Sequence, residues 1–378
     1  MRGTASISAV GLLAVIGLWS SLTQSAAKLA PTDERPAIIR GFTAAEASNG
    51  AYVVLYGRRG KDPRQFFAPL LVRDGHRTQL LPGLAAGDDG STPRVVVADG
   101  GPCIGYNKDD RALVACLSSG RWQRRGLPAG ELLADLVSHR RRMVALTIGG
   151  SRRHIERRVY AATARGWRRL AVVPRVVSQS TVGLAQTWSG TDSAVVFTLD
   201  ARPGARGRFR VLALRQRRWR EVTHDWRTTF SPFRKGPVVT SDGVLVALTE
   251  IHGSRGDFAL VHLGSERSGR VFRRPAAGLA QGALSVTRSG SWIWWQDHIL
   301  EPKGALRIDA YAGAVDACTG KVSSVQRFWH GRAAVPISAE IVELAGRPTV
   351  LYLKSGPDPD ASPRLATVAL RVARASCR

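Results

Sequence analysis

Five acidic residues share one kind of position in the sequence, at or just past the end of a short apolar segment that reads as a β-strand. They are Asp99, Asp200, Glu250, Asp297 and Glu343. If these strands surround one axis, their ends lie at similar heights and the carboxylates converge. Carboxylate oxygens bind a hard cation such as calcium, and a carboxylate pair can act as general acid and base on a sugar. Alternatively, the acids occupy turns and pair with the many arginines.

Aromatic residues alternate with cations in three segments that we expect to be loops. HDWRTTFSPFRKGP (224–237) contains Trp226, Arg227 and Phe230, STVGLAQTWSGT (180–191) contains Trp188, and RFWHGR (327–332) contains Trp329 and His330. Rings that stack, combined with positive charge, suit a glycan or another polyanion. The same rings could instead cap the ends of sheets.

Arginine is concentrated in one part of the chain. The sequence has 55 basic and 29 acidic residues and a formal charge of +26. Residues 121–227 contain 23 arginines and seven acidic residues, which accounts for +16 of that charge. Three related segments lie there, SGRWQRRGLP (119–128), ARGWRRLAVVP (164–174) and QRRWREVTHD (216–225). Such asymmetry predicts a polarised surface potential.

Each of these segments has one tryptophan flanked by arginines. We predict that Trp122, Trp167 and Trp219 pack between neighbouring sheets, where a large flat ring fills the space. The arginines are then placed on outermost strands, and we single out Arg124, Arg125, Arg168 and Arg169. Their charge has two interpretations: it prevents edge-to-edge association of strands, or it forms a basic binding face.

The four cysteines are an even set, which in an exported protein favours disulfides over a metal site. Cys103 and Cys116 flank the turn-like residues 107–110, so a hairpin would bring them together. By elimination Cys318 would pair with Cys377, although the sequence permits three pairings. No Cys-x-x-Cys spacing is present, so neither a zinc site nor a redox pair is indicated.

The N-terminus has the layout of a secretory signal peptide. Arg2 precedes a 16-residue apolar run from Ile7 to Leu22, and small residues at 25–27 suit cleavage. The run is short for a membrane-spanning helix. We predict a signal over residues 1–27, a single domain over 28–378, and a secreted or periplasmic protein. An uncleaved N-terminal anchor is the alternative.

After residue 28 the chain alternates two parts seven times, an apolar strand with a small or acidic corner and a strand–turn–strand unit. Units of about 50 residues fit a four-stranded propeller blade. The chain resembles the bacterial secreted β-propellers, with a kelch-like tryptophan in the outer hairpin. We therefore predict an all-β, seven-bladed β-propeller, with six or eight blades as alternatives. The apolar strands would be innermost, residues 36–42 would add a strand to the last blade, and 128–142 is the one helix candidate.

The sequence lacks the usual catalytic signatures. There is no Gly-x-Ser-x-Gly elbow, His-Glu-x-x-His pair, phosphate loop or dinucleotide fingerprint. We therefore favour a non-enzymatic binding or scaffolding propeller, a monomer whose basic face meets an anionic partner: an envelope polysaccharide, lipid headgroups, nucleic acid or an acidic protein. The alternative is a glycan-active enzyme, a sialidase-like hydrolase or a lyase, with its site at the mouth of a central channel.

Overall fold

The structure is a computed structural model. It describes residues 27–28, 38–48, 50–58, 64–73, 77–81, 83–85, 92–98, 101–139, 142–151, 154–174, 181–185, 195–200, 207–215, 218–221, 226–228, 231–232, 238–240, 243–252, 255–264, 270–276, 279–300, 306–316, 322–333, 337–354 and 364–372. Between 175 and 281, side chains are described only at 212, 214 and 218–220. Within these ranges, no helix has the length and apolar character needed to cross a membrane.

In the described part of the chain, strands form seven antiparallel sheets, each made of consecutive strands. Sheet 1 contains β1 (Ala27–Lys28), β2 (Ile38–Ala47), β3 (Gly50–Arg58), β4 (Gln65–Arg73), β5 (Arg77–Leu80) and β6 (Leu84–Ala85). Sheet 2 contains β7 (Arg94–Ala98), β8 (Gly101–Lys108), β9 (Arg111–Ser118) and β10 (Arg121–Gly126). Sheet 3 contains β11 (Glu131–His139), β12 (Arg142–Ser151), β13 (His154–Thr163) and β14 (Gly166–Val172).

The remaining four sheets follow in chain order. Sheet 4 contains β15 (Thr181–Ala185), β16 (Val195–Asp200), β17 (Gly207–Arg215), β18 (Arg218–Glu221) and β19 (Trp226–Thr228). Sheet 5 contains β20 (Ser231–Pro232), β21 (Val238–Thr240), β22 (Gly243–His252), β23 (Arg255–Gly264) and β24 (Arg270–Ala276). Sheet 6 contains β25 (Leu279–Thr287), β26 (Gly290–Leu300), β27 (Leu306–Val315) and β28 (Val322–Ala333). Sheet 7 contains β29 (Ala339–Leu344), β30 (Arg347–Lys354) and β31 (Arg364–Ala369).

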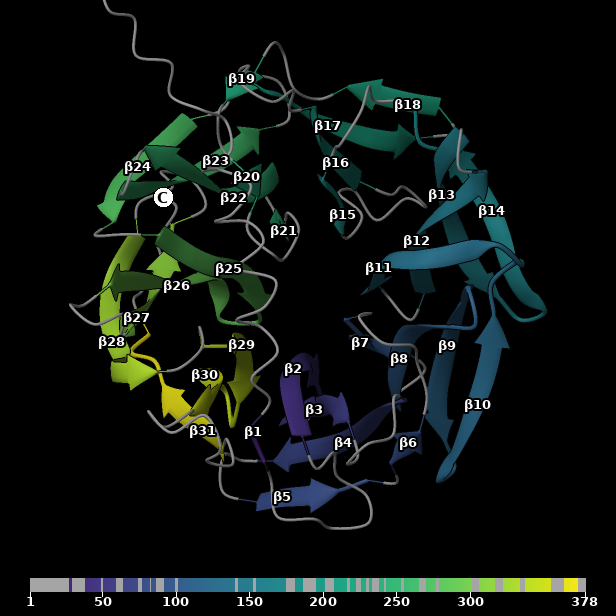
Figure 1. The fold of residues 1–378 in the computed structure, drawn as a ribbon, viewed down its shortest axis with the longest axis horizontal. Coiled ribbons are helices and arrows are strands. Elements are labelled where there is room, and N and C mark those ends of the chain that lie inside the picture. The colour runs from purple at the N-terminus through teal and green to yellow at the C-terminus, as the bar shows by residue number, and fades with distance from the viewer. Residues whose placement is uncertain are drawn as a thin grey trace, which may run out of the picture.

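The sheets follow one another around a common centre (Figure 1). Strands β2, β7, β11, β15, β25 and β29 lie nearest the centre, and β10, β14, β18, β24 and β28 lie at the outer rim. Sheet 7 returns to the side of sheet 1, where β29 contacts both β2 and β3. The predicted all-β architecture of four-stranded antiparallel sheets is confirmed.

Among the described side chains, those of sheets 1, 2, 3 and 7 are buried on both faces of the sheet, against the two neighbouring sheets. On β3, Val53 packs in the core shared with sheet 7, whereas the next residue, Val54, packs in the core shared with sheet 2. Successive residues of a strand point to opposite faces. A strand with two buried faces is therefore apolar at every position, which explains runs such as AYVVLYG.

The tryptophans of the outer strands lie where the sequence predicts. Trp122 packs in the core between sheets 1 and 2, and Trp167 in the core between sheets 2 and 3. Trp219 packs in the core between sheets 3 and 4, and its indole Nε1 donates a hydrogen bond to the Val172 carbonyl at 2.7 Å. The prediction that these three rings fill the spaces between neighbouring sheets is confirmed.

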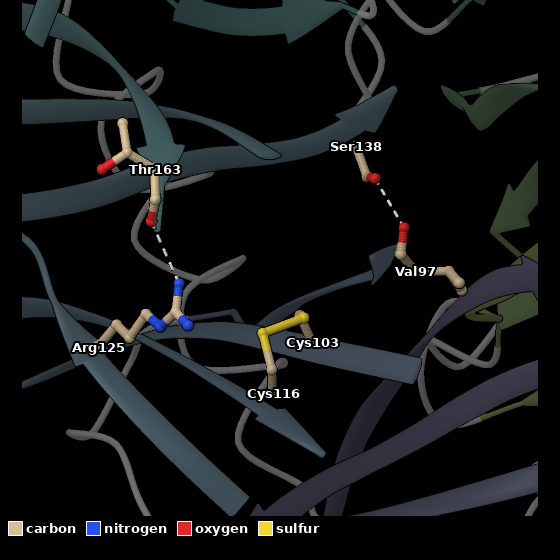
Figure 2. Close-up of a disulfide and its surroundings, with 6 residues drawn as sticks. All are labelled: Val97, Cys103, Cys116, Arg125, Ser138 and Thr163. Carbon is tan, nitrogen blue, oxygen red and sulfur yellow. Dashed lines mark hydrogen bonds between the residues drawn. A yellow bond between two sulfur atoms is a disulfide. The ribbon is translucent and has the colours of Figure 1, made fainter. Parts of the chain in front are cut away.

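The Cys103–Cys116 disulfide is also confirmed. The two cysteines are directly opposite each other on β8 and β9, with their Cα atoms 4.0 Å apart (Figure 2). Cys318 and Cys377 lie outside the described residues, as does the predicted signal up to residue 26. The second pairing therefore stays a prediction.

The helix predicted for residues 128–142 is wrong, because this segment forms strand β11. The register of β11 on β12 shifts between Leu133 and Asp135, so one extra residue is accommodated there. A bulge of this kind interrupts the alternation of a strand and produces the spacing that resembles a helix. The Asn107 side chain hydrogen-bonds both the N–H and the carbonyl of Leu133, at 2.6 and 3.2 Å, and so satisfies the backbone at the bulge.

Two further expectations about strand placement are wrong. The apolar segments predicted to be innermost mostly form the strand that pairs with the innermost one on its outer side. We call these second strands, and they are β3, β12, β16, β22 and β26. Second strands are flanked within their sheet and covered on both faces, so they are more apolar than the strands at the axis. Segment 36–42 does not extend sheet 7: Ile38 begins β2, which pairs with β3 in sheet 1.

The first and last sheets are joined by side-chain packing, in the core that sheets 1 and 7 share. Leu351 on β30 is fully buried in the core that sheet 7 shares with sheet 1. We expect Leu351→Ala to lower the free energy of unfolding by about 2–5 kcal/mol, because it leaves a cavity in this core. Denaturant titration measures the loss. Val372→Ala, at a side chain 55% exposed, is the matched control and should change stability by less than about 0.5 kcal/mol. Equal effects would contradict this account of ring closure.

Candidate functional site

Exposed arginines cover the outer strands of three consecutive sheets. The strands are β10, β14 and β18, at the rim of the ring (Figure 1). We call the exposed arginines on these strands, together with the one in the turn before β14, the arginine band: Arg121, Arg124, Arg125, Arg165, Arg168, Arg169, Arg218 and Arg220. All eight side chains are exposed. The prediction that arginines beside the tryptophans occupy outermost strands is confirmed.

Two hydrogen bonds connect the band from one sheet to the next. The Arg125 Nη1 atom donates to the Thr163 carbonyl at 3.3 Å, which links β10 to the β13–β14 turn (Figure 2). The bond from Trp219 to the Val172 carbonyl links β18 to the end of β14. These bonds therefore join sheet 2 to sheet 3 and sheet 3 to sheet 4 at the outer rim.

We call the line along which two neighbouring sheets meet a seam. The seam between sheets 2 and 3 lies beneath the band, and hydrogen bonds join the two sheets nearer the axis as well. The Ser138 hydroxyl donates to the Val97 carbonyl at 2.6 Å (Figure 2), and Arg94 Nε lies 3.1 Å from Asp135 Oδ1. These contacts join β7 to β11. Both the inner and the outer ends of this seam are therefore connected by hydrogen bonds, which fixes the relative position of β10 and β14.

A buried carboxylate organises the same seam. Glu131 is 2% exposed and accepts hydrogen bonds from Thr147 Oγ1 at 2.5 Å, from Tyr160 OH at 3.2 Å and from Arg158 Nη1. Burial raises the pKa of the Tyr160 phenol, and the Glu131 carboxylate raises it further, whereas the guanidinium groups of Arg158 and Arg169 lower it. Hydrogen bonds from its guanidinium to Glu156 and Glu131 raise the pKa of Arg158. Arg158 thus pairs with two carboxylates of its own sheet, and we do not count it as part of the band.

Alternation along the outer strands decides which seam each arginine faces. Directly opposite residues of paired strands lie on the same face. Arg125 is opposite Val114 and Arg169 is opposite Tyr160, and both partners belong to the core between sheets 2 and 3. Arg124 faces the other way, towards Tyr106, whose pKa is raised by burial and lowered by this guanidinium.

The predicted ring of carboxylates is wrong for the two members whose side chains are described. Glu343 Oε2 accepts a hydrogen bond from the N–H of Ser289 at 2.9 Å, in the turn that precedes β26. Asp297 lies near the far end of β26, seven residues after Gly290, which is about 23 Å along a strand. Glu343 therefore lies beside the start of β26 and Asp297 near its far end, so the two carboxylates do not share a height.

The other predicted acidic ligands are only partly described. Asp99 lies outside the described residues, and Asp200 and Glu250 are placed on β16 and β22 by their backbones alone. Among the described side chains, no three of His, Cys, Asp or Glu gather in a way that could bind a metal ion.

Trp329 and His330, predicted to act together, lie on opposite faces of β28. Trp329 packs against the core between sheets 6 and 7. His330 is directly opposite Asp309, which is opposite Asp297. The His330 Nδ1 atom contacts the Asp309 carboxylate, and Arg327 Nη1 lies 3.8 Å from it. Two of the predicted residues, Asp297 and His330, thus share one row with Asp309, but the Trp329 ring does not join them.

The structure does not describe the side chains of the remaining residues predicted for the aromatic segments. Trp226 and Arg227 lie on β19, which pairs with β17 opposite Phe209 and Arg208. Trp188 and Phe230 lie outside the described residues.

A second cluster, of which the sequence analysis names only Glu343, lies where sheets 1, 6 and 7 meet. Glu46 near the end of β2 lies 3.4 Å from Arg288 Nε in the β25–β26 turn, and it accepts a hydrogen bond from the Glu343 backbone. Thr287 and Ser289 place hydroxyls 2.8 Å apart in the same turn. We call Glu46, Arg288 and Glu343 the axial cluster. Finding it from the sequence would require knowing that β2 and β29 are neighbours.

The stability of the protein should depend on the ionisation of Glu46. Burial raises the pKa of the Glu46 carboxyl, the Glu343 carboxylate raises it further, and Arg288 lowers it. The contribution of Glu46 is therefore complete below its ordinary pKa of 4.5 and is lost as pH rises through the folded-state pKa. We expect Glu46→Gln to lose less stability than wild type as pH rises from about 4 to 7, as measured by thermal unfolding. Identical profiles would contradict this assignment.

Comparison with known proteins gives a fold and no family. No family of known proteins matches the sequence, and no curated protein matches it. The structure is similar to an acylaminoacyl peptidase from Pyrococcus horikoshii, with 11% identity over 88% of this chain and 52% of the peptidase, and a TM-score of 0.51. The chain thus spans about half the length of the first proteins that it matches.

Two other similar structures cover most of both chains. One is a putative 6-phosphogluconolactonase from Bacteroides fragilis, with 9% identity, coverage of 91% and 98%, and a TM-score of 0.49. The other is a mutant Aleuria aurantia lectin in complex with α-methyl-L-fucoside, with 12% identity, coverage of 78% and 96%, and a TM-score of 0.47. The arrangement of consecutive antiparallel sheets around a common centre is that of a β-propeller, and the sequence belongs to no family that these comparisons identify.

Proposed function

We propose that the chain is an exported, monomeric, seven-bladed β-propeller that binds an anionic partner through the arginine band and does so without catalysis. One observation carries the proposal: seven exposed arginines lie on the outer strands of three consecutive sheets, and Arg165 lies in the turn before one of them. The strands β10 and β14 contain no acidic residue. A continuous field of one sign attracts a polyanion and releases its counterions on binding.

Protection of strand edges accounts for part of this arrangement. An exposed edge needs only a charge or two to prevent pairing with another chain, and the outer strands β24 and β28 also contain three and two arginines, whereas β31 has Arg364 alone. The band has three arginines on β10 and two each on β14 and β18. Hydrogen bonds between these sheets hold the arginines of consecutive sheets beside one another, which supports a binding surface.

Export is supported by the apolar N-terminal run and by the disulfide. Cys103 and Cys116 are oxidised in the structure, and disulfides persist in secreted and periplasmic proteins. Envelope polysaccharides, lipid headgroups, extracellular nucleic acid and acidic proteins are all anionic partners of that environment.

The band should determine the salt dependence of binding. Replacing Arg124, Arg125, Arg168 and Arg169 with Ser should reduce the slope of log affinity against log salt concentration by up to about four ion equivalents. Titration against heparin at several salt concentrations measures it. The matched control removes four exposed charges from sheet 7 with Arg347, Lys354, Arg364 and Arg371→Ser, and should leave the slope nearly unchanged. Unchanged heparin binding by the band variant, with new self-association in light scattering, would refute the proposal in favour of edge protection.

The axial cluster supports a second candidate, a glycan-active hydrolase or lyase. Two neighbouring carboxylates can divide the roles of acid and base on a sugar, and burial and the Glu343 carboxylate raise the pKa of Glu46. If this activity exists, Glu46→Gln and Glu343→Gln should each abolish turnover of an anionic glycan, while the band variant should keep the wild-type kcat. Absence of turnover by the wild-type protein across sulfated and uronic-acid glycans would exclude this candidate.

A further inference from the structure

The aromatic rings of the arginine band are not available for stacking. Trp122, Trp167 and Trp219 are half-buried and pack into the cores between sheets. The indole Nε1 of Trp167 is buried, and that of Trp219 is bonded to the Val172 carbonyl. These tryptophans are also the only aromatic residues on the three outer strands. The described side chains of these three strands therefore present guanidinium groups and no aromatic ring beyond the three that pack into the cores.

The seam between sheets 2 and 3 collects the charges of the band from two sides. Arg121, Gln123 and Arg125 alternate with Trp122 and Arg124 on β10, so the former three share the face towards sheet 3. Arg169 faces the same seam from β14. Arg125 crosses the seam to reach the Thr163 carbonyl. Three guanidinium groups and one amide thus border a single line where two sheets meet.

We propose that the partner of the arginine band is a linear anionic polysaccharide that lies along the seam between sheets 2 and 3. This inference rests on the proposed function and adds the class of its ligand. Guanidinium groups bind carboxylate and sulfate in pairs of parallel hydrogen bonds, and the Gln123 amide can bond a sugar hydroxyl. Single-stranded nucleic acid gains much of its affinity from bases stacked on aromatic rings, which this surface does not offer.

The span of the seam favours a dense polyanion. Arg121 and Arg125 are four residues apart on one strand, about 13 Å. A sulfated or uronic-acid polysaccharide places several charged groups within such a length on a flexible chain. An anionic polysaccharide and a single-stranded nucleic acid are both polyanions. Discrimination between them therefore depends on how closely the charges are spaced and on the missing stacking.

The test compares two polymers of equal charge on the same variants. A heparin oligosaccharide and a dT oligomer with the same number of negative charges are titrated against wild type, Arg125→Ser with Arg169→Ser, and the control Arg347→Ser with Arg364→Ser. We expect wild type to bind the oligosaccharide at least about tenfold more tightly than the dT oligomer. The seam variant should lose at least about tenfold in oligosaccharide affinity, and the control less than about threefold.

A second variant guards against damage to the fold, because Arg125 also bonds Thr163. Arg125→Lys with Arg169→Lys keeps both charges and removes the paired hydrogen bonds. It should retain the salt slope and lose several-fold in oligosaccharide affinity. Circular dichroism and thermal unfolding confirm that each variant is folded.

The outcomes separate the two proposals. If the dT oligomer binds as tightly as the oligosaccharide, and the seam variant weakens both, the binding surface stands and the polysaccharide assignment is overturned. If neither ligand responds to the seam variant, or if both respond equally to the control, the proposed function fails as well. Undiminished oligosaccharide affinity in the lysine variant would overturn the paired contacts.

Discussion

Sheets 1, 2, 3 and 7 each bury both of their faces, and the rest of the described structure depends on that constraint. Adjacent residues such as Val53 and Val54 serve two different cores, so each strand connects the sheet before it to the sheet after it. Burial of apolar area on both sides is the main favourable contribution to folding. None of these four sheets has an apolar face left uncovered, so the polar sites described here lie at the strand ends near the axis and at the outer rim.

The two candidate sites occupy these two remaining locations. The axial cluster lies at the ends of innermost strands, where three sheets meet and a carboxylate is partly withdrawn from water. The arginine band lies on outermost strands, where one face of each strand is turned into a seam and the edge is open. Trp122 and Arg125 illustrate the division: the ring enters one core, and the guanidinium three residues later reaches over the next seam.

The sequence predicts the parts of the fold that depend on local pattern. Regular short strands, the tryptophans of the outer hairpins and the Cys103–Cys116 pair are all visible in residue types and spacing. The register of β11 was not predictable, because its bulge is stabilised by Asn107 from another sheet. The prediction that the most apolar strands are innermost is also wrong, because the apolar content of a strand reflects its burial and not its distance from the axis. Contacts such as that between Glu46 and Arg288 join residues about 240 positions apart, and no local pattern contains them.

The disulfide joins strands that already pair, so its effect differs from that of a bond between distant sheets. A shift of one residue between β8 and β9 would turn every side chain of β9 to the opposite face, and β10 would move with it. The tryptophan of β10 would then leave its core, and its arginines would face the wrong seam. By holding Cys103 opposite Cys116, the covalent bond excludes that misalignment. In an oxidising environment, the bond thereby fixes which arginines of β10 face sheet 1 and which face sheet 3.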